Sequence, residues 1–247
     1  MKNVVKVIDS AVQEDRKIIM DSLSLTIKKG EFVVILGGNG AGKSTLFNLI
    51  SGNLKLTSGE IKISGENISD WPEEKRAKHV ARVFQDPKMG TAPRMTVSEN
   101  LLLAMYRGEA RSLQKRQLKK HKQSFMGLVK LIDNGLKNHL DTPTGNLSGG
   151  QRQALSLLMA TMKNPDLLLL DEHTAALDPK TSIQLMELTN QRVTENKLTC
   201  LMITHNMEYA LKYGNRLLIL ENGKIVRDLN LQEKASLQLG DLLQFFK

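Results

Sequence analysis

The sequence predicts an α/β fold with a mainly parallel sheet, an N-terminal antiparallel β segment and a helical insertion. Short apolar runs alternate with helix-like segments through most of the chain. Two of these runs, EFVVIL at 31–36 and DLLLL at 166–170, lack the polar–apolar alternation of a half-exposed strand. Such runs are typical of parallel strands buried on both faces. From 86 to 146 the strand signal stops and helical periodicity replaces it.

Each expected strand is a short apolar or β-branched run. These strands are 3–9, 23–29, 31–36, 59–64, 80–84, 166–170, 198–204 and 216–220. A helix is expected over 43–51, directly after a glycine cluster. Another helix should begin after Asp178 as N-cap, with Pro179 at its first position. Asn222 and Gly223 predict a hairpin turn after the last strand.

The helical insertion has one apolar stripe at helical spacing. Its residues are Leu118, His121, Phe125, Val129 and Ile132. We expect one domain over 1–247, in which 1–85 and 161–247 form the core and 86–160 form a helical subdomain. Residues 239–247 predict a short amphipathic helix that packs on the core.

Composition narrows the class of protein. The net charge of +9 favours anionic partners. The stretch 106–124 is the most basic, and it is expected to be either a solvated helix face or a surface near lipid headgroups or nucleic acid. Cys200 is the single cysteine, so an internal disulfide is excluded, which suits a reducing cytoplasm. No run approaches the ~20 apolar residues of a membrane span, so we expect the chain not to cross a membrane.

The strongest local signal is GGNGAGKST, which fits the pattern G-x-x-x-x-G-K-[ST] between an expected strand and an expected helix. Backbone N–H groups of such a loop cradle phosphate oxygens, and the helix directs its positive end at the same anion. Lys43 should reach the β- and γ-phosphates, and Ser44 should ligate Mg²⁺. The residues expected to bind nucleotide here are Gly37, Gly38, Asn39, Gly40, Ala41, Gly42, Lys43, Ser44 and Thr45. The sequence therefore predicts a P-loop NTPase that uses ATP and Mg²⁺.

The stretch LLLLDEHTAALDP, 167–179, places two carboxylates at the end of an expected buried strand. Asp171 can reach the Mg²⁺ of a bound nucleotide, because ligands bind at the carboxyl ends of strands in such folds. Glu172 is then free to orient and polarise the attacking water. For His173 two interpretations stay open: a structural residue, or a residue that tunes Glu172 or senses pH.

The stretch LSGGQ opens an apolar helix, so it places a second helix N-terminus at the surface. A helix N-terminus is an anion site, although a glycine-rich N-cap alone would look the same. The residues concerned are Ser148, Gly149, Gly150 and Gln151.

Together these motifs resemble the ATP-binding-cassette (ABC) ATPase family over essentially the whole chain. GGNGAGKST is similar to its Walker A loop, LSGGQ to its signature and LLLLDE to its Walker B strand. VFQDP supplies the Q-loop Gln85, AALD the D-loop Asp178, and ITHN the switch His205. The resemblance implies Glu172 as general base, His205 as the residue that positions the γ-phosphate, and Gln85 as a metal ligand that reports the nucleotide state.

The resemblance also implies partners. Two copies would pack head to tail, so that Ser148 of each caps the γ-phosphate held by Lys43 of the other. The resemblance to one uptake group implies an importer ATPase on the cytoplasmic face of the membrane. It would work with transmembrane permease subunits and, indirectly, a substrate-binding protein. The solute would be small, with an amino acid as one possibility, and no nucleic acid partner is expected.

Three departures and two rival functions accompany this interpretation. Gly38 stands where proline is frequent in the family, and His173 stands where proline usually follows the glutamate. The aromatic ring that the family usually places before Walker A to stack on adenine is absent, and Val12 lies near its expected place. Phe32 is expected in the core and not at the nucleotide base. Without a ring to stack on the base, we expect weak discrimination between ATP and GTP.

A soluble ABC ATPase acting on nucleic acid or the ribosome would suit the charge, but the chain lacks a second cassette and a long coiled coil. A small-molecule kinase would not explain LSGGQ with His205.

Overall fold

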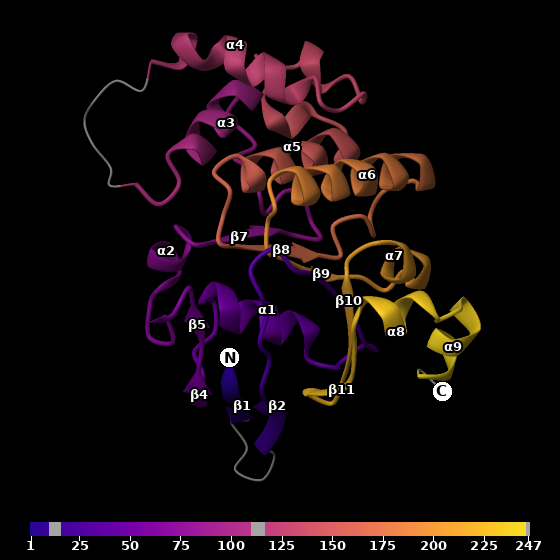
Figure 1. Cartoon of the computed structure of the whole chain (residues 1–247). Helices are drawn as coiled ribbons and strands as arrows, with labels where there is room; N and C mark the ends of the chain where they lie inside the picture. Colours follow the sequence, from indigo (N-terminus) through magenta and orange to yellow (C-terminus); the bar gives the residue numbers. More distant parts are fainter. Residues whose placement is uncertain (10–15, 110–116, 246–247) are drawn as a thin grey trace.

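The computed structural model describes residues 1–9, 16–109 and 117–245 (Figure 1). The strands are β1 (Lys2–Asp9), β2 (Arg16–Leu23), β3 (Phe32–Leu36), β4 (Ser58–Glu60), β5 (Lys62–Ile63), β6 (Glu66–Asn67), β7 (Val80–Val83), β8 (Leu167–Asp171), β9 (Cys200–Ile203), β10 (Arg216–Glu221) and β11 (Lys224–Leu229). The α-helices are α1 (Lys43–Ser51), α2 (Glu73–Arg76), α3 (Val97–Met105), α4 (Leu118–Val129), α5 (Gly149–Thr161), α6 (Pro179–Glu195), α7 (Met207–Lys212), α8 (Leu231–Ala235) and α9 (Leu239–Gln244). Two 3-10 turns, η1 (Leu136–Asn138) and η2 (Thr144–Asn146), precede α5.

The central sheet has the order β11-β10-β3-β9-β8-β7. All neighbouring pairs from β10 to β7 are parallel, and β11 joins the edge by an antiparallel hairpin with β10. The register pairs Val33 with Leu201, and Leu168 with Cys200. The prediction of a mainly parallel α/β sheet is therefore confirmed.

Both faces of the sheet are buried, which explains the unbroken apolar runs. In β8, Leu168 and Leu170 belong to the cluster under α5 and α6, whereas Leu167 and Leu169 belong to the cluster around α1. In β3, Val34 likewise belongs to the cluster under α5 and α6, and Val33 belongs to the cluster around α1. Each fully buried side chain of this size contributes about 2 kcal/mol of transfer free energy. The strands are therefore fixed from both sides, and so are the loops at their ends.

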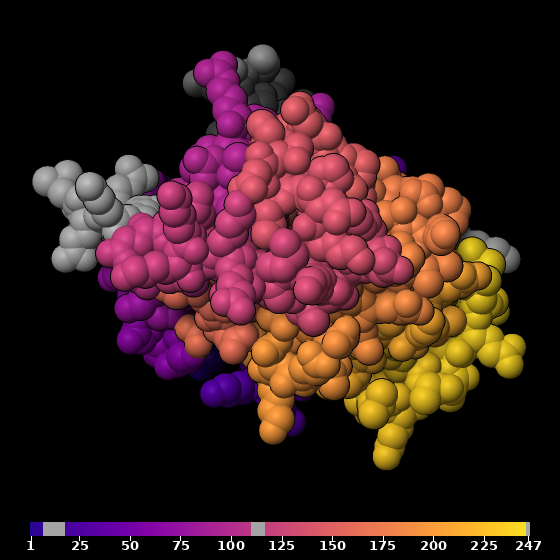
Figure 2. Space-filling model, turned by 90° about the horizontal axis from the view of Figure 1, so that it is seen from above, coloured from indigo at the N-terminus to yellow at the C-terminus, as the bar shows by residue number. Residues whose placement is uncertain are grey.

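The molecule has three layers around this sheet (Figure 1). Helices α3, α4, α5 and α6 lie above the sheet, and α1 lies below it with the N-terminal strands. Seen from above, the segment from α3 to α6 forms the near surface, and the C-terminal segment lies at one edge (Figure 2). The boundaries 86 and 160 of the helical subdomain stay a prediction. No helix in the described parts of the chain has the length and apolar character needed to cross a membrane.

Two strand predictions near the N-terminus need correction. The expected strand 23–29 is wrong, because β2 spans Arg16–Leu23 and pairs with β1, and residues 24–28 are not in a strand. Leu25 is buried without being in a strand. The alternation of apolar residues in 23–29 therefore reflects packing against the core and not pairing in a sheet. The expected strand 59–64 is divided, because β4 pairs with β1 and β5 pairs with β6. At the division, Ile61 N–H donates to Ser69 Oγ instead of a strand partner.

Other local predictions are confirmed. Asp178 is the N-cap of α6, and its side chain accepts from Thr181 N–H. Asn222 and Gly223 have positive φ angles of 46° and 75° in the β10–β11 turn, where a glycine tolerates the left-handed conformation best. The predicted stripe is buried at Phe125, Val129 and Ile132 but only half-buried at Leu118 and His121. Helix α9 packs on the core through Leu242, as expected for the C-terminal segment up to residue 245.

The carboxyl end of α1 is held by a buried arginine that the sequence analysis did not single out. Arg76 is 2% exposed and donates to the carbonyls of Leu49 and Ile50, which are among the last four of the helix. The same guanidinium donates to the carbonyls of Ser69 and Trp71. These acceptors at the end of a helix have no intrahelical partner, so Arg76 satisfies them and fixes α1.

We predict that Arg76→Gln lowers the free energy of unfolding by about 2–3 kcal/mol, because a shorter amide leaves buried carbonyls unsatisfied. Chemical denaturation at neutral pH measures this change. Arg227→Gln, at an exposed position on β11, is the matched control and should cost little. A loss for Arg76→Gln no larger than that of the control would contradict the bracing role.

Candidate active site

Four neighbouring strands of the sheet each end in one of the predicted motifs. The loop 37–42 follows β3, His205 follows β9, Asp171 ends β8, and Gln85 follows β7. These strands are adjacent and parallel in the order β3-β9-β8-β7, so their carboxyl ends lie along one edge. The fold therefore brings together residues that are up to 168 positions apart, between Gly37 and His205.

The phosphate loop is shaped by close backbone packing. Gly42 precedes α1 with φ of 100°, and a Cβ there would lie 2.5 Å from Met20 Cε. Lys43 Nζ donates to the carbonyls of Gly37 at 2.7 Å and Gly38 at 2.9 Å. An ammonium has three N–H donors, so one remains for a phosphate oxygen. Ser44 and Thr45 follow in the first turn of α1.

Three charged groups act on one another at this edge. Burial lowers the pKa of the Lys43 ammonium, while the nearby carboxylates of Glu172 and Asp171 raise it. The Glu172 side chain is 21% exposed, and its Oε2 lies 3.2 Å from His205 Nδ1. Glu172 also has φ of 45°, in the left-handed region that non-glycine residues rarely adopt. Its backbone is held there, because its N–H donates to Ile203 O and its carbonyl accepts from Ala175 N–H.

His173 has a structural environment. Its ring is 2% exposed, and Nε2 lies 3.0 Å from Thr189 Oγ1 on α6. The Thr189 hydroxyl donates its one proton to Leu185 O, so His173 Nε2 carries a proton and donates to Thr189. Burial lowers the pKa of His173 to about 4, so the ring is neutral near pH 7. This geometry favours the structural interpretation, in which His173 anchors the loop that carries Glu172.

The loop that carries Gln85 is tied to the signature helix. Gln85 is exposed two residues after the end of β7, and Gln153 Nε2 of α5 donates to the carbonyl of the intervening Phe84 at 2.8 Å. Gln153 is fully buried, whereas Phe84 is half-buried, so water has little access to the donor side of this bond. A shift of α5 would therefore move the backbone next to Gln85.

The signature residues form a second, separate surface. Ser148 is the N-cap of α5 in a capping box with Gln151. A cavity of about 440 Å³ lies beside it. Its lining consists of Asp133, Asn134, Ser148, Gly149, Gly150, Gln151, Ala176, Leu177, Asp178, Lys180, Thr181 and Gln184. Hydrogen bonds from Thr181 lower the pKa of Asp178, so this carboxylate is charged at neutral pH. None of the phosphate-loop residues, Glu172 or His205 lines this cavity.

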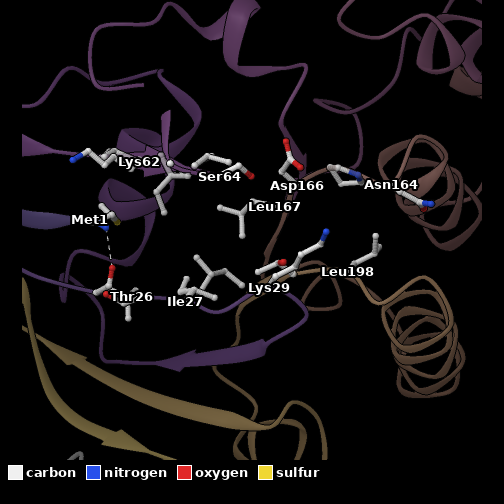
Figure 3. A pocket seen from close by; sticks show the side chains of 18 of the residues that line it. Met1, Thr26, Ile27, Lys29, Lys62, Ser64, Asn164, Asp166, Leu167 and Leu198 are labelled. Atoms are coloured by element: carbon white, nitrogen blue, oxygen red, sulfur yellow. Dashed lines mark hydrogen bonds between the residues drawn. The ribbon is translucent and has the colours of Figure 1, made fainter. Parts of the chain in front are cut away.

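A larger cavity, of about 680 Å³, lies away from both surfaces (Figure 3). Leu167 and Leu198 border it, close to where β8 and β9 begin, together with Met1 and Lys62 from the N-terminal segment. It is therefore at the amino ends of the strands, opposite the edge where ligands bind in such folds.

The donor set fits Mg²⁺. Ser44, Gln85 and Asp171 offer hydroxyl, amide and carboxylate oxygens, which are the ligands that this ion prefers. The parts of the chain that the structure describes contain no group of three or more His, Cys, Asp or Glu side chains placed to hold a metal ion. A Mg²⁺ ion here would therefore depend on few protein ligands together with phosphate oxygens and water, as is usual at nucleotide sites.

Several residues at this edge were missed by sequence reasoning. Arg82 of β7 contacts Asp171 and Asn48, and Gln153 holds the carbonyl of Phe84. The one available signal for Arg82 was a charged residue in the middle of the apolar run VARVF.

Phe32 is 5% exposed and belongs to the core, as predicted. Val12, the position considered for adenine stacking, lies outside the described residues, and so do Arg111, Lys115 and Arg116 of the basic stretch.

The fold and the motif-bearing edge define a nucleotide hydrolase of the P-loop class. The sequence profile of the ABC transporter family matches residues 20–175, and this chain belongs to that family and is an ATPase. A tyrosine transport ATP-binding protein of Clostridioides difficile (strain R20291) is 48% identical over 229 residues, which cover 93% of this chain and 91% of that protein. The spermidine/putrescine import ATP-binding protein PotA of Haemophilus influenzae is 34% identical over 85% of this chain, which spans 53% of that longer relative. Among solved structures, the ATP-binding cassette MJ0796, a dimer in a post-hydrolysis state bound to ADP and Pi, matches with a TM-score of 0.77 at 28% identity, over 93% of this chain and 97% of that one.

We predict that His173 makes the protein less stable in acid. The ordinary pKa of 6.5 falls to about 4 on folding, so between these values the unfolded chain binds a proton that the folded chain does not. This difference has no effect above pH 6.5, where the ring is neutral in both states, and it costs about 2 kcal/mol of stability by pH 5. His173→Gln should therefore lose less stability than wild type between pH 7 and pH 5, as measured by urea unfolding at each pH.

Two outcomes would contradict this role. One is an equal loss of stability in wild type and His173→Gln over the same pH range. The other is a shift of the pH profile of ATP hydrolysis above pH 6 in the variant, which would favour tuning of Glu172 or pH sensing.

Proposed function

We propose that this chain is the ATP-hydrolysing subunit of an importer that takes up a small solute, with an amino acid as the solute class. The 48% identity to a tyrosine transport ATP-binding protein supports the transport role, and the division of the motif residues between two surfaces of one chain supports the pairing of two copies. Lys43, Asp171 and Glu172 lie at the strand ends, whereas Ser148 and Asp178 line a separate cavity. Each surface holds half of a nucleotide site, so a second copy is needed to complete it.

In the proposed assembly, two copies pack head to tail about a two-fold axis, and one interface creates two composite sites. Residues 37–45 hold the phosphates of one ATP, and the partner's Ser148 and signature helix N-terminus cap the γ-phosphate. Asp178 lies beside the same signature surface. The solved cassette at 28% identity is a dimer, which supports the pairing of two copies.

The proposed chemistry assigns one task to each residue at the strand ends. Ser44, Gln85 and Asp171 bind Mg²⁺, which supplies charge stabilisation at the phosphates when bound. Glu172 accepts a proton from the attacking water, and His205, which lies 3.2 Å from Glu172, positions the γ-phosphate. Lys43 neutralises charge on the transferred phosphoryl group.

Coupling to transport is assigned to the loop that carries Gln85. The bond from Gln153 to Phe84 links this loop to the signature helix, so closure of the sandwich can move it. We propose that transmembrane permease subunits contact this region on the inner face of the cell membrane, and that a substrate-binding protein delivers the solute to them. The relative with 48% identity, whose name gives tyrosine transport, supports the solute class.

Uptake by the reconstituted transporter tests the proposed function. The chain is co-purified with a candidate permease and placed in liposomes with ATP inside, and radiolabelled tyrosine and phenylalanine are supplied outside with a candidate binding protein. ATP-dependent uptake that is lost in Lys43→Ala supports the proposal. Salt-dependent binding to RNA or ribosomes that stimulates ATP hydrolysis, without any permease complex, would favour the soluble ATPase instead.

We predict that Glu172→Gln binds ATP but hydrolyses it at least 10²-fold more slowly, because the change keeps size and removes the base. ATP with Mg²⁺ should then convert the variant to a stable dimer, which size exclusion with light scattering detects. Glu187→Gln, on α6, is the matched control and should hydrolyse ATP as wild type does. A variant that stays monomeric under saturating ATP, or that turns over near the wild-type rate, would argue against the assigned role.

A further inference from the structure

Arg82 is a charged residue in the middle of a buried strand. Its neighbours Ala81 and Val83 belong to the cluster under α5, and Val80 belongs to the cluster around α1. Side chains alternate across a strand, so Arg82 lies on the α1 side, where an apolar residue is expected. A guanidinium in such a place needs partners that compensate for lost hydration.

Arg82 has two polar partners on different elements. Its Nη2 donates to Asp171 Oδ2 of β8 at 2.5 Å, and its Nη1 donates to Asn48 Oδ1 of α1 at 2.6 Å. The guanidinium carbon lies 4.8 Å from the centre of the Phe84 ring. The side chains of Arg82 and Asp171 are 11% and 13% exposed, so water screens the pair only slightly. The guanidinium of Arg82 therefore links β7, β8 and α1 at one point.

That point is next to the residues that we assign to Mg²⁺. Asn48 lies four residues after Ser44 on α1, so the two side chains share one face of the helix. Arg82 donates a hydrogen bond to Asp171 Oδ2, whereas Asp171 Oδ1 has no hydrogen-bond partner within the described residues. One carboxylate oxygen is therefore held and the other is left for a further ligand.

We propose that Arg82 is a positioning residue for the magnesium site, which holds the Asp171 carboxylate so that Oδ1 faces the metal. The inference rests on the proposed role of Asp171 as a metal ligand. Residues that orient metal ligands through hydrogen bonds usually contribute 10–100-fold to metal affinity or activity. Arg82 and Asn48 together orient Asp171 relative to the helix that carries Ser44.

Positioning and simple electrostatics predict opposite changes in Mg²⁺ affinity when the charge of Arg82 is removed. A positive charge beside Asp171 repels Mg²⁺, so on electrostatic grounds its removal would tighten metal binding. If positioning dominates, removal frees the carboxylate to rotate and weakens metal binding. The direction of the change therefore separates the two effects.

The test measures how much Mg²⁺ strengthens nucleotide binding, without turnover. The dissociation constant of a mant-labelled, non-hydrolysable ATP analogue is measured with EDTA and with saturating Mg²⁺, and the ratio of the two is the gain. For Arg82→Gln we expect the EDTA value to stay near that of wild type and the gain to fall roughly tenfold. Arg82→Lys should fall between wild type and Arg82→Gln, because one ammonium cannot hold Asp171 and Asn48 together as a planar fork does.

Two further variants make the result specific. Arg76→Gln removes another buried guanidinium, whose hydrogen bonds within the described residues all go to backbone carbonyls, and should lose stability but keep the full Mg²⁺ gain. Asp171→Asn should lose the gain, and if it does not, the assignment of Asp171 fails and the inference fails with it.

A normal or increased gain in Arg82→Gln, with the gain lost in Asp171→Asn, overturns the role of Arg82 alone. If Arg82→Gln does not fold, Arg82→Lys carries the test, and a wild-type gain in Arg82→Lys overturns the inference. The inference is also overturned if the Mg²⁺ gain falls in both Arg82→Gln and Arg76→Gln, in proportion to the drop in melting temperature of each variant.

Discussion

Burial of β3, β9, β8 and β7 on both faces is the constraint on which the rest of this structure depends. Apolar residues from each strand enter two separate clusters, one under α5 and α6 and one around α1. Because the strands are parallel and adjacent, their carboxyl ends meet along one edge, and the loops that follow these four strands all begin there. The motif residues therefore come together through the fold, although they are far apart in the sequence.

The same burial sets the charge balance at the edge. Asp171 and Glu172 are consecutive acids at the end of a buried strand, and such a pair is unfavourable without cations nearby. Lys43 lies close enough to interact with both carboxylates, and Arg82 pairs directly with Asp171. His173 adds no charge near neutral pH, because burial lowers its pKa to about 4. The acids are thus held in fixed directions by cations and by the backbone contacts of Glu172.

Local sequence signals predicted the elements that depend on neighbouring residues in the chain. The N-cap Asp178, the turn at Asn222 and the strand that ends in Asp171 were all readable, because capping, turn formation and burial leave local patterns. The strand expected over 23–29 was wrong, because Leu25 is apolar for packing and not for pairing. Arg82 was missed because its partners, Asn48 and Asp171, are 34 and 89 positions away. Only the fold brings such partners together.

Disulfide trapping can show whether the phosphate loop of one copy faces the signature of the other. Asn39 and Ser148 are both exposed, and native Cys200 is fully buried with its thiol pKa raised by burial, so it stays unreactive. Chains with Asn39→Cys are mixed with chains with Ser148→Cys under mild oxidation. A composite site predicts a heterodimer of twice the chain mass that forms only with ATP and Mg²⁺. No heterodimer with ATP and Mg²⁺, or the same yield without nucleotide, would contradict the composite site.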